Sequence, residues 1–455
     1  MKRPAVPIAV AAVIAACLIA AAGASAHPVI SGHQVPHVFV KRPGAAPTTA
    51  DCQRIIGISC YSPAQLQKAY DLAPLYGAGL NGSGKTIVIV DSFGSPTIEN
   101  DLAQFDSDFG LPAPPSLKVI TPAGAPPPFD PNDDDMVGWA GETTLDVEWA
   151  HAIAPGANIL LVETPVSETE GETGFPEIVE AENFVIDHNL GDVISQSFGA
   201  TEETFKSKGS LLSLRGAFKN AARHGVTVLG ASGDSGSTDF MLDLQNVFRT
   251  QVNSWPSSDP LVTSVGGTQL HLDAAGNRLA PDNVWNDIPI GIDAAGGGGP
   301  SHVFPRPDFQ RHTNTGAGNA RATPDISMSA AVDGGALVFE SFPGDPGGYS
   351  IVGGTSWATP LFSGIVAIAD QAAGHRLGLI NPTLYDRLAG RHGGSGIVDV
   401  TIGDNTFTQL DADGNPEFTV PGFKAVPGYD MASGLGSVDA TPFTTQLAKR
   451  SRASF

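Results

Sequence analysis

Positive charge is scarce in this sequence, and charged residues of either sign are few. Only 25 of its 455 residues are lysine or arginine, against 47 aspartates and glutamates, which gives a formal net charge of −22. No basic stretch is long enough to follow a phosphate backbone, so we expect no nucleic-acid partner. Because many of the carboxylates become neutral at low pH, the chain avoids the large positive charge that drives acid unfolding. The composition therefore favours a soluble, acid-tolerant globular protein.

Long apolar runs are also scarce. An alanine-rich run at residues 8–22 follows Lys2 and Arg3 and precedes Ala24-Ser25-Ala26, which has the small-x-small form of a signal cleavage site. The run is short for a membrane span, and no other stretch reaches about 18 apolar residues. We therefore predict a signal peptide at residues 1–26, secretion, and no membrane contact after cleavage.

Cysteine is scarce as well, with three in the whole chain. Cys17 lies inside the predicted signal peptide, so the mature protein keeps Cys52 and Cys60 in an oxidising compartment. We predict a disulfide between these two, which closes a small loop as a structural staple. The loop belongs to a short N-terminal extension, residues 27–60, whose part up to about residue 50 is rich in proline, alanine and threonine and is expected to be exposed.

Residues 61–455 have the sequence pattern of one domain, in which apolar β-branched runs alternate with helical patterns. This alternation is typical of an α/β fold with a mostly parallel central sheet and helices on both faces. The expected strands are residues 86–90, 158–162, 192–197 and 226–229, and the expected helices include residues 142–153 and 211–224.

One glycine-rich motif suggests a function that its context excludes. Residues 79–86 read Gly-Leu-Asn-Gly-Ser-Gly-Lys-Thr and match the phosphate-loop pattern of nucleotide-binding enzymes. A phosphate loop follows a strand and opens a helix, so that the helix N-terminus faces the phosphates. Here the strand follows the motif instead. We interpret the glycines as a turn into the first core strand.

A candidate nucleophile stands in Gly353-Gly354-Thr355-Ser356, just before an apolar helical pattern. A serine hydroxyl needs a base to take its proton, so the sequence must supply one. A subtilisin-like triad of Asp91, His151 and Ser356 has the right order of residue types. Helix geometry argues against it, because His151 falls about 180° from the face of Glu142. At the end of its helix, His151 is expected to be exposed or to bond a carbonyl group.

Carboxylates offer an alternative base. On the same helix Asp146 lies about 40° from Glu142, one turn away, whereas Glu148 lies about 120° off that face and is expected in solvent. Two carboxyl groups on one face can share a proton, which makes a workable base in acid. A third carboxyl, Asp234, follows the strand at residues 226–229, where α/β sheets bind ligands, and in its protonated form it could donate to an oxyanion.

Taken together, these pieces resemble the sedolisin family, the serine-carboxyl peptidases, over about residues 61–438. The matching motifs are Gly141-Glu142-Thr143-Thr144-Leu145-Asp146, Gly233-Asp234-Ser235-Gly236, Gly266-Gly267-Thr268, Pro324-Asp325, and Gly354-Thr355-Ser356 with Pro360. The resemblance implies a subtilisin-like fold and an endopeptidase acting in acid on polypeptides. It implies that Ser356 is the nucleophile, Glu142 the base, Asp146 the residue that orients and tunes Glu142, and Asp234 the oxyanion donor.

The resemblance also implies one structural calcium ion near the C-terminus. Its ligands would be the carboxylates of Asp399 and Asp430 and the backbone carbonyls of Val400, Val426 and Gly428, hard oxygen donors that suit Ca²⁺. The family usually has a glycine where Val426 stands. A second acidic segment, residues 411–416, fails as an EF-hand because proline occupies its sixth position, and it favours a hairpin turn.

Several alternatives stay open at this point. The chain could be a secreted binding protein that keeps the fold without turnover. Residues 195–199, Ser-Gln-Ser-Phe-Gly, could pair with a substrate backbone or form an ordinary core strand. Sedolisins usually carry a large propeptide domain, whereas only about 34 residues separate Ala26 from Tyr61. We expect a monomer, and side-chain preference does not follow from the sequence.

Overall fold

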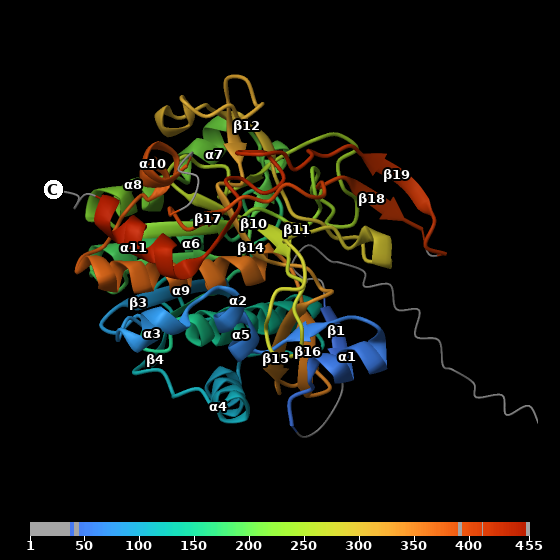
Figure 1. The fold of residues 1–455 in the computed structure, drawn as a ribbon. Coiled ribbons are helices and arrows are strands. Elements are labelled where there is room, and N and C mark those ends of the chain that lie inside the picture. Colours follow the sequence, from blue (N-terminus) through green and yellow to red (C-terminus); the bar gives the residue numbers. More distant parts are fainter. Residues whose placement is uncertain (1–36, 41–44, 390–393, 412, 452–455) are drawn as a thin grey trace, which may run out of the picture.

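An eight-stranded, mostly parallel sheet forms the centre of the molecule (Figure 1). The structure is a computed structural model and describes residues 37–40, 45–389, 394–411 and 413–451, so the predicted signal peptide lies outside it. The sheet order is β11-β10-β8-β6-β3-β5-β4, with β14 paired to β10, and only the β10–β11 pair is antiparallel. The strands are β3 (Thr86–Ser92), β4 (Leu117–Ile120), β5 (Asn158–Thr164), β6 (Val193–Gln196), β8 (Thr227–Ala231), β10 (Thr263–Gln269), β11 (Asn283–Val284) and β14 (Ile326–Ser329).

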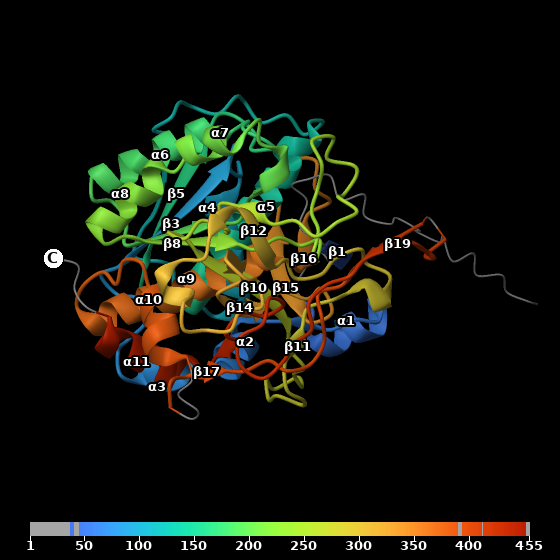
Figure 2. The same ribbon diagram turned by 90° about the horizontal axis from the view of Figure 1, so that it is seen from above.

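Helices cover both faces of this sheet, as Figure 2 shows. Alternate residues of β3 point to opposite sides, so Ile87 and Ile89 join one hydrophobic core and Val88 and Val90 join the other. The first core includes α5 (Asp134–Ile153) and α9 (Thr355–Ala373), and the second includes α6 (Phe175–Asp187) and α8 (Gly216–His224). The predicted α/β fold and its four strands are confirmed.

A second, four-stranded sheet leads directly to the predicted nucleophile. Its order is β1-β16-β15-β2, made of β1 (His37–Val40), β16 (Gly348–Val352), β15 (Gly335–Glu340) and β2 (Cys60–Tyr61). The chain passes from β16 through two glycines into α9. β1 belongs to the extension in which we expected no regular element, and it pairs antiparallel with β16.

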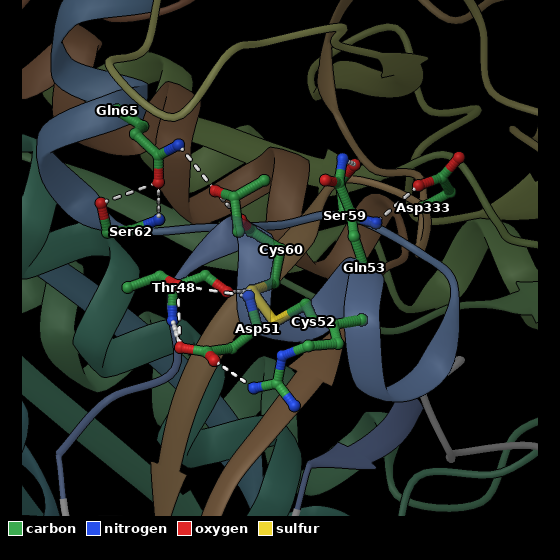
Figure 3. Close-up of a disulfide and its surroundings, with 11 residues drawn as sticks. Thr48, Asp51, Cys52, Gln53, Ser59, Cys60, Ser62, Gln65 and Asp333 are labelled. Carbon is green, nitrogen blue, oxygen red and sulfur yellow. Dashed lines mark hydrogen bonds and ion pairs between the residues drawn. A yellow bond between two sulfur atoms is a disulfide. The ribbon is translucent and has the colours of Figure 1, made fainter.

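The disulfide between Cys52 and Cys60 is present, as predicted (Figure 3). It joins α1 (Thr49–Ile56) to β2 across a sequence separation of 8 residues. The Ser59 backbone N–H donates to Asp333 Oδ1 at 2.8 Å, within the segment that leads into β15 (Figure 3). The closed loop therefore holds the N-terminal segment against the second sheet.

Three local expectations can be compared with the structure. The glycine-rich segment at 79–86 is a turn that precedes β3, and the N–H groups of Asn81 and Gly82 donate to Gln371 Oε1 at 2.9 and 2.8 Å. The segment at 411–416 joins β18 (Phe407–Leu410) to β19 (Pro416–Val420) as a hairpin. The helix expected at 211–224 is two helices, α7 (Lys208–Ser213) and α8.

Within the described residues, no helix is long and apolar enough to cross a membrane.

The remaining elements are short and lie around these two sheets. They are α2 (Pro63–Ala69), α3 (Ala73–Gly77), α4 (Ile98–Phe109), α10 (Asn381–Thr383), α11 (Ala440–Arg450), β7 (Ala200–Thr201), β9 (Ser254–Trp255), β12 (Gly299–Pro305), β13 (Ala320–Thr323), β17 (Ile397–Val398) and β20 (Ser437–Val438). Of these, α4 matters for the site, because it packs against α5 on the side away from α9.

Candidate active site

Ser356 lies in the first turn of α9, in a position that the two preceding glycines make possible. Gly354 has a φ of 108°, which disfavours residues with a side chain, and a Cβ on Gly353 would lie 2.6 Å from the Ala330 carbonyl oxygen. The Ser356 side chain is largely buried, and its Oγ donates to the Ser197 carbonyl oxygen at 3.4 Å. The turn therefore presents a hydroxyl at a helix N-terminus, as the sequence indicated.

Pro360 explains a second contact of the nucleophile. It stands four residues after Ser356 in α9 and has no N–H, so the Ser356 carbonyl lacks its usual helical donor. Ser197 Oγ occupies that place, 3.2 Å from the Ser356 carbonyl oxygen and 2.9 Å from Asp146 Oδ1. One hydroxyl thus connects the nucleophile's backbone to a carboxyl group of α5.

Glu142 and Asp146 lie one turn apart on α5 and are both buried, with exposed fractions of 3% and 0%. Burial is the main factor that raises the pKa of both groups well above their ordinary values. The charges of Asp91 and Asp234 raise the pKa of Glu142, and the charges of Glu142 and Asp91 raise the pKa of Asp146. The interaction with Ser356 lowers the pKa of Glu142. The side chains of Glu142 and Ser356 are therefore close to each other in the site.

Two other residues of α5 do not lie where the sequence suggested. Glu148 was expected in solvent, but its side chain is fully buried and its Oε2 accepts from the Phe339 N–H at 3.1 Å. His151 is also fully buried, and its Nε2 lies 2.8 Å from the Pro112 carbonyl oxygen and 3.2 Å from Asp106 Oδ1. His151 was expected either to be exposed or to bond a carbonyl group. It contacts a carbonyl group and is not exposed.

These two corrections share one physical reason. From Glu142 to Ile153 every residue of α5 is buried, because the helix is enclosed between α9, α4, β15 and the central sheet. An enclosed helix has no solvent face for a charged residue to occupy. His151 points to the α4 side, where Asp106 lies, so the helix geometry that argued against a histidine base holds in the structure.

Asp91 is another buried carboxyl at this site, and it lies near the end of β3. It was considered in the sequence only as a member of the rejected histidine triad. Burial raises its pKa to about 7, the Thr143 side chain lowers it, and the charge of Glu163, its partner in register on β5, raises it. Its charge in turn raises the pKa of Glu142 and Asp146. An aspartate directly after a buried strand was the signal that could have placed it here.

Asp234 follows β8, on the other side of the nucleophile. Its Oδ1 accepts from the Thr355 backbone N–H at 2.8 Å and from Thr355 Oγ1 at 2.7 Å. Burial raises the pKa of Asp234 to about 6, the two bonds from Thr355 lower it, and the charge of Asp239 raises it. Because Thr355 directly precedes Ser356, these bonds hold the Asp234 carboxyl beside the nucleophile.

Only the end of the segment at 195–199 is free to meet a substrate. Ser195 and Gln196 belong to β6, which pairs with β8 over both residues and with β3 as far as Ser195. These two residues are therefore core, as the plainer interpretation held. Ser197 to Gly199 follow β6, and the Ser197 carbonyl oxygen accepts from the Ser356 hydroxyl.

The residues suggested for calcium come together in two neighbouring loops. Asp399 Oδ2 accepts from the Gly428 N–H and Asp430 Oδ2 accepts from the Val426 N–H, both at 2.9 Å. Asp430 Oδ1 also accepts from Ser433, so it stabilises its own turn. Among the described residues, no backbone N–H donates to the carbonyls of Val400, Val426 or Gly428. The donor types fit a hard cation.

The fold and the site together define a subtilisin-like architecture in which a serine hydroxyl lies beside buried carboxyl groups. The family model described as the subtilase family matches residues 135–383, which is more than half of the chain. Kumamolisin from Bacillus sp. (strain MN-32) is 33% identical over 388 residues, covering 83% of this chain and 62% of the relative. Sedolisin from Pseudomonas sp. (strain 101) is 29% identical over 393 residues, covering 85% and 61%.

The solved structure of Pseudomonas sedolisin, a serine-carboxyl proteinase complexed with two molecules of pseudo-iodotyrostatin, matches 88% of this chain and 100% of that chain at 28% identity, with a TM-score of 0.70. The chain therefore belongs to the subtilase family, in its sedolisin branch of serine-carboxyl peptidases. It spans 62% and 61% of the lengths of kumamolisin and sedolisin.

Proposed function

We propose that this protein is a secreted, acid-acting endopeptidase that hydrolyses polypeptides through an acyl-enzyme on Ser356. The observation that carries the proposal is the pair of buried carboxyls, Glu142 and Asp146, beside the Ser356 hydroxyl, while His151 is engaged with Asp106 and Pro112. The disulfide at Cys52 is consistent with an oxidising compartment.

Glu142 acts as the general base. It takes the proton from Ser356 Oγ as that oxygen bonds to the peptide carbonyl carbon, and it later gives the proton to the departing amine. Water then attacks the acyl-enzyme, and Glu142 again removes a proton, which returns to Ser356 Oγ when the acid product leaves. Two protonated carboxyls at Glu142 and Asp146 need to lose only one proton to supply this base.

Asp146 positions that base. The Ser197 hydroxyl donates to Asp146 Oδ1, and burial together with the neighbouring Glu142 raises the pKa of Asp146, so its carboxyl can keep a proton that would otherwise be released. With the proton on Asp146, its partner Glu142 carries the single negative charge of the pair. The like-charge repulsion in the pair opposes loss of the second proton.

Asp234 stabilises the oxyanion. Its Oδ1 is occupied by the two bonds from Thr355, so the proton of its acid form sits on Oδ2 and is available to the substrate oxygen. Because its pKa is raised to about 6, this donor is present in acid and is lost as the pH rises through that value. An acidic optimum follows from this loss.

The Ca²⁺ site is a further part of the proposal. Asp399 and Asp430 would supply carboxylates and Val400, Val426 and Gly428 would supply carbonyl oxygens, as in the related family. The donor chemistry and the unused backbone carbonyls support this assignment. When bound, the ion would hold the two loops together without taking part in the reaction.

The decisive experiment compares wild type with Ser356→Ala on denatured protein at about pH 4 and about pH 8. We expect cleavage by wild type at the lower pH and none by the variant. Ser363→Ala is a matched control, since Ser363 is a buried serine of the same helix that bonds only the Pro360 carbonyl. Equal inertness of wild type and Ser356→Ala would favour a binding protein, and equal or greater activity at the higher pH would refute acid action.

A further inference from the structure

A small cavity beside the catalytic carboxyls has no part in the mechanism proposed above. It has a volume of ≈ 240 Å³ and lies between the segments that follow β3 and β4, the first turn of α5, and Glu163 near the end of β5. We propose that this cavity is a substrate subsite that receives one large apolar or aromatic side chain of the peptide, within a few residues of the scissile bond. The inference rests on the peptidase function proposed above and names the class of its substrates.

Most of the residues that line the cavity have apolar side chains. Phe93, Phe129 and Met136 face it together with three prolines, and Phe129 is itself held edge-on by Phe342 at a ring-centroid distance of 6.3 Å. Aromatic rings and a methionine thioether are favourable partners for an aromatic side chain. Pockets that enclose whole small molecules measure roughly 300–1,000 Å³, so this one suits a single side chain.

The backbone that forms one wall adopts an uncommon conformation. Phe93 has a φ of 58°, which is rare for a bulky residue, and its N–H donates to the Thr164 carbonyl at 2.9 Å. The next residue, Gly94, approaches Glu163 so closely that an added Cβ would lie 1.9 Å from Glu163 Oε1. Backbone strain of this kind concentrates at functional sites. Here it keeps the Phe93 ring in the wall of the cavity.

The cavity lies along the same helix, α5, as Glu142 and Asp146. Ser95, also in its lining, lies 3.4 Å from Thr144 Oγ1, and Thr144 is two residues after Glu142 on α5. Met136 precedes Glu142 by six residues, a distance of about 9 Å along the helix axis. An extended peptide advances about 3.3–3.6 Å per residue, so a side chain near the scissile bond can reach the cavity.

The cavity is also uncharged under the conditions in which the enzyme should act. Glu163 is the carboxyl in its lining, and burial raises the pKa of Glu163 to about 7. The nearest carboxyl on the adjacent strand, Asp91, also has a pKa of about 7, so both groups are neutral in acid. A neutral, apolar cavity favours an apolar occupant over a lysine or an aspartate.

A peptide series tests the inference. Fluorogenic peptides carry Phe, Ala or Lys in turn at each of three positions on either side of one scissile bond, and kcat/KM is measured at about pH 4. We expect wild type to prefer Phe over Ala at one of these positions. Phe129→Ala should reduce that preference about 3- to 10-fold, because it removes one aromatic contact, while peptides with Ala there are cleaved as before.

Two further variants guard against a trivial loss of structure. Phe418→Ala removes a half-buried phenylalanine from another cavity, one that Gln409 and Glu417 also line, and should leave the preference unchanged. Glu163→Gln keeps the shape and neutrality of the wall at pH 4 and should also retain the preference. The inference is overturned if Phe129→Ala and Met136→Ala leave the Phe-to-Ala ratio at every position within about twofold of wild type. It is also overturned if Glu163→Gln abolishes the preference. Absence of any Ser356-dependent cleavage would instead refute the proposed function.

Discussion

Glu340 at the end of β15 offers a direct test of how this fold responds to pH. Its side chain is 6% exposed, and its Oε2 accepts from the Ser350 hydroxyl. The pKa of Glu340 is raised from 4.5 to about 8, mainly by burial and also by the charges of Asp345 and Asp101, while the bond from Ser350 lowers it. The charge of Glu340 also raises the pKa of Glu148 on α5. We predict that Glu340→Gln removes the part of the loss of stability at neutral pH that Glu340 itself causes.

The sign follows from proton binding. Between pH 4.5 and 8 the folded protein holds a proton on Glu340 that the unfolded chain releases, so stability present below pH 4.5 is lost as the pH rises. At pH 7, about 2.5 pH units of this interval have passed, which at about 1.4 kcal/mol each amounts to about 3 kcal/mol. Glutamine cannot ionise and occupies nearly the same volume, so Glu340→Gln should match wild type at pH 4 and exceed it by about 3 kcal/mol at pH 7.

The measurement is urea unfolding at the two pH values, in a Ser356→Ala background that prevents self-digestion. Glu417→Gln is the matched control, because Glu417 is exposed and its ion pair with Arg249 is long, at 3.9 Å. We expect the control to follow wild type at both pH values. If Glu340→Gln and wild type lose the same free energy of unfolding between pH 4 and pH 7, the burial argument for Glu340 is wrong.

Three further predictions concern the site and the loops. Asp234→Ala should lower kcat about 10²–10³-fold at its optimum, whereas Asp234→Asn, which keeps a neutral donor, should lose less and should flatten the decline above about pH 6 in the pH–rate profile. Glu142→Gln should lower kcat at least about 10²-fold while His151→Ala, corrected for its folded fraction, stays active; the reverse pattern would restore the histidine mechanism. Chelation should lower the melting temperature, since an ion at 100 times its Kd contributes about 2.7 kcal/mol, and Asp399→Asn but not Asp411→Asn should abolish the effect. A melting temperature that does not respond to chelator would exclude the calcium site.

Local pattern was enough for much of the fold. The strands β3, β5, β6 and β8 were found from short runs of β-branched residues, because a strand buried on both faces must be apolar throughout. The turn at Gly353 and Gly354 was found because few residues other than glycine fit there. The disulfide was predicted because an even number of cysteines remains once the predicted signal peptide is set aside.

The local sequence pattern could not predict which ionisable side chains are buried. Glu148 looked like a solvent residue because its angle around α5 put it away from Glu142 and Asp146, and the sequence does not show that β15 and α4 cover that side of the helix. The same enclosure buries His151 against Asp106. Long-range packing, and not helix period, decides which face of a fully enclosed helix meets water.

By itself, the sequence determined the α/β class, the positions of four core strands in the chain, the serine at a helix start and the carboxyl pair one turn apart on α5. These depend on period and on backbone sterics, which act over a few residues. The tertiary structure decided which carboxyls share one dielectric environment. It brought Asp91 and Asp234 to the same edge of the sheet from segments 143 residues apart in number, where burial raises the pKa of each and their charges raise the pKa of Glu142. It also formed the cavity at Phe93, because the segments that surround it meet only when β3, β5 and α5 have packed together.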